Sequence, residues 1–298
     1  MALHPAPARI DRSAEERDAS GLLDSVAADP ATRVLVVRGD AAPVLDTPDG
    51  APVLALAEVA DVGGRPHWAF LGRGDDGAAV LLAAVPADAE PLGAETSWRS
   101  IREVGALLAR TQLDALVVGV ALGRWLVEAP FCPACGTLTV LAQAGWSRHC
   151  PGCGREHFPR TDPAVIVAIT SADGERLLLG ANAAWKGRMY SCFAGFVEAG
   201  ESLETTVHRE LQEEAGVRVD HIRYLGSQPW PYPRSLMLGF LASAVDDDEA
   251  RADGTEILDV RWFTREEIGE AFAGRGPIAL PGAVSIAHGL IRAWYEGA

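Results

Sequence analysis

The sequence lacks any long uninterrupted run of apolar residues. The run Ala115–Gly123 ends after nine residues and is flanked by Asp114 and Arg124, whereas a membrane-spanning helix needs about 20 predominantly apolar residues. We therefore expect no transmembrane helix. The residues after Met1 also lack the charged and apolar segments of a secretory signal, so the expected location is the cytoplasm.

Positive charge is also scarce. Lys and Arg number 26 against 41 Asp and Glu, which gives a net charge of −15. An acidic protein repels phosphate backbones at long range, so non-specific nucleic-acid binding driven by overall charge is excluded and only a local basic patch is allowed. Hydrophobic residues make up 48% and charged residues 22% of the chain, which excludes the disordered and fibrous classes.

The length of 298 residues predicts two domains and a small third module. Short β-type runs bounded by Gly, Pro or Asp predict a small antiparallel sheet in the first part of the chain. Helical spacing then follows, first after an N-cap at Ser97 and again from about residue 113 to residue 128. We assign residues 1–128 to an N-terminal α+β domain, residues 129–160 to a cysteine-containing module and residues 161–298 to a mixed α/β domain.

The α/β domain begins with two strands joined by a turn at Asp173-Gly174. A helix is expected near 203–215, and Thr264 with Glu267 forms a capping box for a second one. The remaining expected elements are strands near 222–227, 236–245 and 257–263 and a last helix near 285–295.

Four of the five cysteines form two C-x2-C pairs separated by fourteen residues: Cys132, Cys135, Cys150 and Cys153. Two such turns facing each other provide four thiolates in a tetrahedron, which suits a structural Zn²⁺ with no open coordination position. Two disulfides and an iron–sulfur centre are the alternatives.

The fifth cysteine, Cys192, lies in an apolar run and is predicted to be a small core residue rather than a nucleophile. The cysteine module also carries a basic cluster, which forms either a solubilising surface or a contact to a substrate phosphate or to RNA. Its members are Arg148, His149, Arg155, His157 and Arg160.

Three carboxylates are predicted to share one face of the helix near 203–215. Glu210, Glu213 and Glu214 are spaced i, i+3 and i+4. At a helix C-terminus they repel one another and oppose the helix dipole, and a hard divalent cation such as Mg²⁺ or Mn²⁺ neutralises such a group. Taken alone, the triplet favours a solvated acidic face over a metal site.

The whole segment 195–217 matches G-x5-E-x7-R-E-U-x-E-E-x-G-U, with U aliphatic, at every fixed position, and so resembles the Nudix hydrolase signature. The resemblance implies a Nudix α/β/α sandwich for residues 161–298 and metal-dependent hydrolysis of a nucleoside diphosphate linked to another group. It implies that Glu210 and Glu214 bind Mg²⁺ or Mn²⁺ with the carbonyl of Ala194, that Glu213 is a ligand or a supporting carboxylate, that Arg209 orients the carboxylates, and that Glu201 holds the loop–helix geometry.

Downstream of this signature, prolines alternate with Trp230 and Tyr232 in the segment Ser227–Ser235. Stiffened aromatic faces suit stacking on a planar ring, although a plain Pro-rich loop is the alternative. The segment resembles the SQPWPFP-x-S motif of NADH pyrophosphatases, with Tyr232 in place of Phe. This resemblance implies substrate contacts by Gln228, Pro229, Trp230, Pro231, Tyr232, Pro233, Arg234 and Ser235.

With the cysteine module included, nearly the whole chain resembles the zinc-ribbon family of NADH pyrophosphatases and NAD-capped RNA hydrolases, which implies a homodimer. The resemblance further implies a stacking role for Phe196, an aromatic substrate contact by Phe158, an additional metal ligand in Glu256, and looser matches to substrate contacts at Arg102 and Ser285. The chain departs from the family at Gly145, where relatives carry a substrate-contacting Glu.

The expected activity is hydrolysis of the pyrophosphate bond of NAD(H) to AMP and NMN(H), together with removal of the NAD cap from RNA 5′ ends. The expected partners are therefore NAD(H), related dinucleotides and the 5′ end of NAD-capped RNA, and no membrane. A broader pyrophosphatase acting on ADP-ribose and other dinucleotides is one alternative. A non-catalytic zinc-ribbon binding protein is the other.

Overall fold

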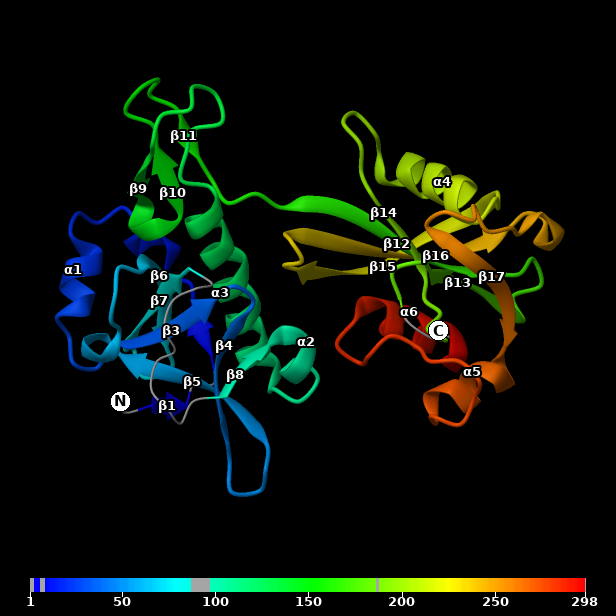
Figure 1. Cartoon of the computed structure of the whole chain (residues 1–298), viewed down its shortest axis with the longest axis horizontal. Helices are drawn as coiled ribbons and strands as arrows, with labels where there is room; N and C mark the ends of the chain where they lie inside the picture. The colour runs from blue at the N-terminus through cyan, green and yellow to red at the C-terminus, as the bar shows by residue number, and fades with distance from the viewer. Residues whose placement is uncertain (1–2, 6–8, 87–96, 186–187, 298) are drawn as a thin grey trace. The chain divides into compact units, whose positions relative to one another are not determined.

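The structure is a computed structural model that describes residues 3–5, 9–86, 97–185 and 188–297. The chain divides into two compact units, Met1–Arg160 and Thr161–Ala298 (Figure 1). No helix within the described ranges is long and apolar enough to span a membrane. The α+β region and the cysteine module belong to the same unit, so the division at residue 128 stays a prediction.

The N-terminal unit is built on an eight-stranded sheet with the order β1-β5-β4-β3-β7-β6-β2, in which β8 pairs with β4. The sheet is mixed because β3 and β7 run parallel, so the prediction of an antiparallel sheet is wrong at this pair. A strand pattern identifies single strands but does not tell which distant strands pair. The strands are β1 Leu3–Pro5, β2 Ile10–Asp11, β3 Arg33–Arg38, β4 Ala41–Asp46, β5 Pro52–Glu58, β6 His67–Gly74, β7 Ala79–Val85 and β8 Ser97–Ser100.

Ser97 does not cap a helix, because it is the first residue of β8. The cap is Ser100, whose backbone N–H and hydroxyl both donate to Glu103 Oε2, at 2.7 and 2.9 Å. The predicted helix at this point is one short turn, and the main helix of the unit is α3, which packs on β3 and β7. The helices are α1 Leu22–Ala27, α2 Ile101–Val104 and α3 Arg110–Glu128, with 3-10 turns at Ala14–Glu16 and Val59–Asp61.

The cysteine module is a three-stranded sheet of β9 Val140–Ala142, β10 Ser147–His149 and β11 Glu156–His157, with a 3-10 turn at Gln143–Gly145. Trp146 attaches this module to the eight-stranded sheet of the same unit, because its indole N–H donates to the carbonyl of Phe70 on β6 at 2.7 Å. Gly145 has a φ of 91°, and a Cβ there would lie 2.5 Å from the Cβ of Ala69. A glutamate therefore has no room at this position.

The C-terminal unit contains a six-stranded sheet with the order β15-β16-β12-β13-β17, in which β14 pairs with β12. The two central strands, β12 and β16, run parallel. The strands are β12 Asp162–Thr170, β13 Arg176–Asn182, β14 Phe193–Phe196, β15 Val219–Trp230, β16 Ser235–Ala244 and β17 Ile257–Thr264; the helices are α4 Leu203–Glu214, α5 Arg265–Phe272 and α6 Ile286–Glu296, with a 3-10 turn at Asp247–Glu249.

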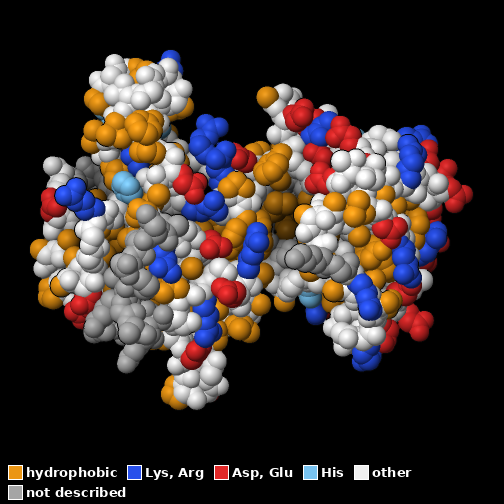
Figure 2. All heavy atoms as spheres, in the orientation of Figure 1, with side chains coloured by type: hydrophobic (Ala, Val, Ile, Leu, Met, Phe, Trp, Pro, Cys, Tyr) orange, Lys and Arg blue, Asp and Glu red, His pale blue; other side chains and the backbone are white. Residues whose placement is uncertain are grey.

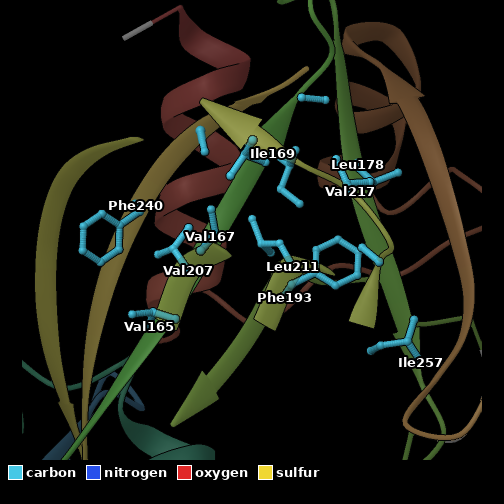
Figure 3. Close-up of a cluster of buried hydrophobic side chains, with 14 residues drawn as sticks. Val165, Val167, Ile169, Leu178, Phe193, Val207, Leu211, Val217, Phe240 and Ile257 are labelled. Carbon is cyan, nitrogen blue, oxygen red and sulfur yellow. The ribbon is translucent and has the colours of Figure 1, made fainter. Parts of the chain in front are cut away.

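Strand β12 is buried on both faces of the sheet. Val165, Val167 and Ile169 pack with Val207 and Leu211 of α4 (Figure 3). The intervening Ile166 and Ala168 pack in a second cluster with Leu290 and Ile291 of α6. Because side chains alternate along a strand, a continuous apolar run serves helices on both faces. Figure 1 shows α4 and α6 on opposite sides of the sheet, which confirms the predicted α/β/α sandwich.

Candidate active site

A cavity of about 580 Å³ in the C-terminal unit brings together most of the residues that the sequence singled out. Its volume lies in the range of small-molecule sites. The predicted site residues that line it are Ala194, Phe196, Arg209, Glu210, Glu214, Gln228, Trp230, Tyr232, Ser235, Glu256 and Ser285. A smaller cavity of about 270 Å³ in the N-terminal unit, between Arg9 and Val118, contains no residue of either motif, so we place the candidate site in the larger one.

The signature glycine Gly195 leaves room for a carboxylate. It lies on β14, and a Cβ at this position would be 1.8 Å from Cδ of Glu210. The strand therefore approaches helix α4 closely enough for Glu210 to lie against the backbone. The helix itself begins at the N-cap Ser202, whose hydroxyl accepts a hydrogen bond from the Thr205 N–H.

Arg209 connects the loop to the carboxylates. Its guanidinium donates to Glu201 at 2.7 Å, Glu210 at 2.8 Å and Glu213 at 3.1 Å, and also to the Phe196 carbonyl at 2.9 Å. The hydrogen bond to Arg209 holds the pKa of Glu201 at about 2, and the bond to Glu201 raises the pKa of Arg209. The planar five-donor guanidinium suits this arrangement, which a lysine could not reproduce.

Glu214 is the most deeply buried carboxylate of the cavity. Its side chain is held by the backbone of Ala194, and burial, reinforced by the charges of Glu256 and Glu210, raises its pKa to about 8. Burial also raises the pKa of Glu210. The second carboxylate oxygen of Glu214, Oε2, is buried without a hydrogen-bond partner in the structure. A buried carboxylate without a partner and with acidic neighbours is stabilised by a divalent cation, so this residue set fits Mg²⁺ or Mn²⁺.

The Pro-rich motif forms the end of β15 and the turn into β16. Both ends of the Gln228 amide are engaged with backbone, because its NH₂ donates to the Val284 carbonyl at 2.6 Å and its oxygen accepts from the Ile286 N–H at 2.7 Å. The rings of Trp230 and Tyr232 are 5.0 Å apart. The other members, which are not among the lining residues of the cavity, are Pro229, Pro231, Pro233 and Arg234.

The remaining predicted contacts lie at several places. Ser285 caps α6, and its hydroxyl accepts from the Ala287 N–H at 3.2 Å. Arg234 pairs with Asp162 at 2.7 Å. Arg102, on α2, and Phe158, which is 52% exposed, belong to the N-terminal unit, so their substrate contacts stay predictions.

Part of the cavity wall consists of residues that the sequence did not single out, notably Trp185, Met189 and Ile286. These side chains belong to no recognisable motif, and the one available signal was a tryptophan in the short loop after β13. Cys192 also lines the cavity, but it is 6% exposed and burial raises the pKa of its thiol to about 12. It is a core residue, as predicted.

The four paired cysteines gather into one cluster, with all their sulfurs within 4.8 Å of one another. They are free thiols, 3.7 Å apart for Cys132 and Cys153 and 3.4 Å apart for Cys135 and Cys150, far longer than the about 2.05 Å of a disulfide. The compact four-sulfur set fits a structural Zn²⁺. Nε2 of His157 lies 3.2 Å from Sγ of Cys132.

The basic cluster of the module loses one of its expected members. Arg148 is 3% exposed, and its guanidinium donates to the Leu126 carbonyl of α3 at 2.6 Å. It therefore fastens the module to α3 and is unavailable to a phosphate. The exposed members are His149, Arg155 and Arg160.

Two family models match the chain. The NUDIX domain matches residues 160–280, and the NADH pyrophosphatase zinc ribbon domain matches residues 128–158. A Mycobacterium bovis protein named NAD-capped RNA hydrolase NudC is 42% identical over 239 residues, which cover 77% of this chain and 75% of that protein. The chain belongs to the NudC family of Nudix hydrolases.

Similarity to the NudC family extends to a human protein. NAD-capped RNA hydrolase NUDT12 is 40% identical over 201 residues, which cover 63% of this chain and 43% of that protein. Among solved structures, a Nudix hydrolase from Nitrosomonas europaea matches with a TM-score of 0.39 and 26% identity, covering 50% of this chain and 96% of that one.

Proposed function

We propose that this NudC-family protein hydrolyses the pyrophosphate bond of NAD(H) to AMP and NMN(H). The observation that carries the proposal is the combination, in one cavity, of the buried carboxylates Glu210 and Glu214 with the aromatic motif residues Trp230 and Tyr232. Carboxylates serve a metal-bound diphosphate, and flat rings serve the planar bases that flank it. Relatives that are 42% and 40% identical to this chain are named NAD-capped RNA hydrolases.

In the proposed mechanism, water attacks one phosphorus of the diphosphate, and the bridging P–O bond breaks to release AMP and NMN(H). Glu210, Glu214, Glu256 and the Ala194 carbonyl would hold Mg²⁺ or Mn²⁺, which neutralises phosphate charge and acidifies a bound water. Glu214 or Glu213 accepts the proton of the attacking water as the general base. Arg209 keeps Glu210 and Glu213 in place.

We extend the proposal to NAD-capped RNA, because the relatives are named for that substrate. An RNA chain continues from the adenosine side of NAD, so the same diphosphate lies in the cleavage site. With a net charge of −15, contact with RNA is restricted to a local basic patch. The exposed Arg155 and Arg160 of the zinc ribbon are our candidates for that patch.

The test compares initial rates on NADH, NAD, ADP-ribose and NAD-capped RNA at equal concentrations, with Mg²⁺ or Mn²⁺, and identifies the products by chromatography. AMP and reduced NMN formed fastest from NADH support the dinucleotide activity. A higher kcat/KM for capped RNA makes decapping the main activity. Preference for ADP-ribose makes the protein a broader pyrophosphatase, and no cleavage of any substrate overturns the proposal in favour of a zinc-ribbon binding protein.

The RNA contact is tested separately with Arg155→Gln/Arg160→Gln. Cleavage of capped RNA should fall while NADH cleavage is kept. The matched control, Arg110→Gln/Arg275→Gln, removes the same charge from exposed positions outside the ribbon, where each arginine pairs with a nearby carboxylate. An equal loss on both substrates, or an equal loss in the control, contradicts a ribbon contact.

We also propose that the protein is a homodimer in the cytoplasm. The ribbon exposes large apolar side chains, with Phe131 at 60%, Leu138 at 59% and Val140 at 59% exposure. Figure 2 shows hydrophobic side chains on the surface of the N-terminal unit, and exposed apolar patches mark interfaces. A reducing compartment keeps the four thiols available for Zn²⁺. Light scattering coupled to gel filtration should give the mass of two chains, and Phe131→Ser/Leu138→Ser should shift it towards one.

A further inference from the structure

Trp185 is a cavity-lining residue that lies outside both sequence motifs. It is 39% exposed, whereas Trp294 in the same unit is 4% exposed in the core. Neither hydrophobic cluster described for the C-terminal unit includes Trp185. A large flat ring that contributes little to the core and faces a cavity is available to a ligand.

The backbone around Trp185 is anchored to a proposed metal ligand. The Ala183 N–H donates to the Glu256 carbonyl at 2.8 Å, and the Trp185 N–H donates to the Asn182 carbonyl at 3.0 Å. The side-chain oxygen of Asn182 accepts from the Ala184 N–H at 2.8 Å. This turn is therefore fixed on Glu256, whose carboxylate lines the same cavity as the indole.

The planar rings of a dinucleotide need flat surfaces, and Trp230, Tyr232 and the 50% exposed Phe196 offer such surfaces in the cavity. We propose that Trp185 adds a further one and is a specificity-determining residue that stacks on a planar heterocycle of the substrate. This inference rests on the proposed function. It predicts that binding depends on a flat ring at position 185 and not only on apolar volume, because stacking requires a π-face.

The test measures NADH binding with the cavity carboxylates unsubstituted, before turnover and with Ca²⁺ in place of Mg²⁺, from the change in NADH fluorescence. Trp185→Leu, which keeps an apolar side chain without a ring, should raise Kd by roughly tenfold or more. Trp185→Phe should stay within about threefold, because the ring is kept. The matched control is Tyr295→Leu, which removes a ring that is also 39% exposed but lies outside the cavity lining, and it should leave Kd unchanged.

A second readout separates stacking from damage to the metal site. Mn²⁺ binding, measured by electron paramagnetic resonance, should be the same in Trp185→Leu and its parent. Parallel losses of Mn²⁺ and NADH binding would mean that the substitution acts through Glu256, and this overturns the stacking role. NADH cleavage by the unsubstituted protein together with an unchanged Kd in Trp185→Leu overturns the stacking role alone. Absence of both NADH binding and cleavage in the unsubstituted protein overturns the proposed function and the stacking role together.

Discussion

The zinc ribbon and the carboxylate cavity both contain side chains that can bind a metal ion, but the two sets differ in how tightly they cluster. The four cysteine sulfurs lie within 4.8 Å of one another, the only such group of ligands among the described residues. The oxygens of Glu210, Glu214 and Glu256 are spread more widely around a cavity of about 580 Å³. A full ligand set leaves a metal no position for substrate, whereas an incomplete one leaves room for water and phosphate. We therefore expect the ribbon to contribute stability and the cavity to carry out the chemistry.

The largest effect should come from Glu214→Gln. The amide keeps the size of the side chain but removes the charge that holds the metal and accepts the proton in the proposed mechanism. We expect kcat for NADH to fall by roughly 100- to 10,000-fold, the usual worth of a general base, with the far-UV circular dichroism unchanged and the zinc content kept. A kcat within a few-fold of wild type would show that Glu214 is not needed for catalysis, and the chemistry could not be assigned to the cavity.

Cys150→Ser should affect zinc binding and stability rather than catalysis. Cys150 is fully buried in the cysteine cluster, and a structural zinc site contributes folding energy directly. We expect bound zinc, measured by inductively coupled plasma mass spectrometry, to fall from one ion per chain to near zero, and Tm to fall by roughly 10 °C. Mn²⁺ binding at the cavity should persist. Cys192→Ala, outside the cluster, is the control and should keep its zinc.

Gly195→Ala should disturb the open site without removing any of its ligands. A Cβ at this position would lie 1.8 Å from Glu210 Cδ, so the carboxylate must move. Displaced ligand geometry typically lowers metal affinity by about 10- to 100-fold, which calorimetric Mn²⁺ titration would measure. Gly226→Ala is the matched control, because a Cβ there has no neighbour within 4 Å. Equal affinities in the two variants would show that the strand does not set the position of Glu210.

The smallest effect concerns pH and the metal-free protein. Burial raises the pKa of Glu214 from 4.5 to about 8, so between these values the folded state binds more protons than the unfolded state. Stability contributed by this group therefore falls as pH rises through that window. The Tm of metal-free wild type should fall relative to that of Glu214→Gln as the pH rises from about 5 to 8. Added Mg²⁺ should restore the Tm of wild type. A constant difference in Tm across this range would contradict the burial of a lone carboxylate.

Much of the fold of the C-terminal unit could be predicted because the patterns that indicate its elements involve residues close together in the sequence. The continuous apolar run of β12 and the capping box at Thr264 are properties of neighbouring residues, and both elements lie where expected. The parallel pairing of β3 with β7 depends on residues 47 positions apart (Val36 pairs with Ala83), which no local pattern encodes. The predicted helix start at Ser97 is wrong for a related reason. Ser97 belongs to β8, which pairs with the distant strand β4.

The same distinction applies to the site. The carboxylates and Arg209 were visible because the chemistry fixes their spacing along one helix. Trp185 comes from a different loop, and only the folded sheet brings it to the cavity. Arg148 was misjudged as a surface charge because its partner, the Leu126 carbonyl, is 22 residues away. Burial of a charged side chain is a property of the packed structure rather than of its neighbours in sequence.

The double hydrogen bond of Gln228 has a consequence for how the cavity meets its ligand. One amide joins the end of β15 to the residues that begin α6, through Val284 and Ile286. Separating these two segments requires both bonds to break, so the structure favours one width of the opening before any ligand arrives. Preorganisation of this kind lowers the entropy that binding must spend on ordering the protein. A ligand that needs a wider opening therefore binds more weakly by the free energy of these bonds.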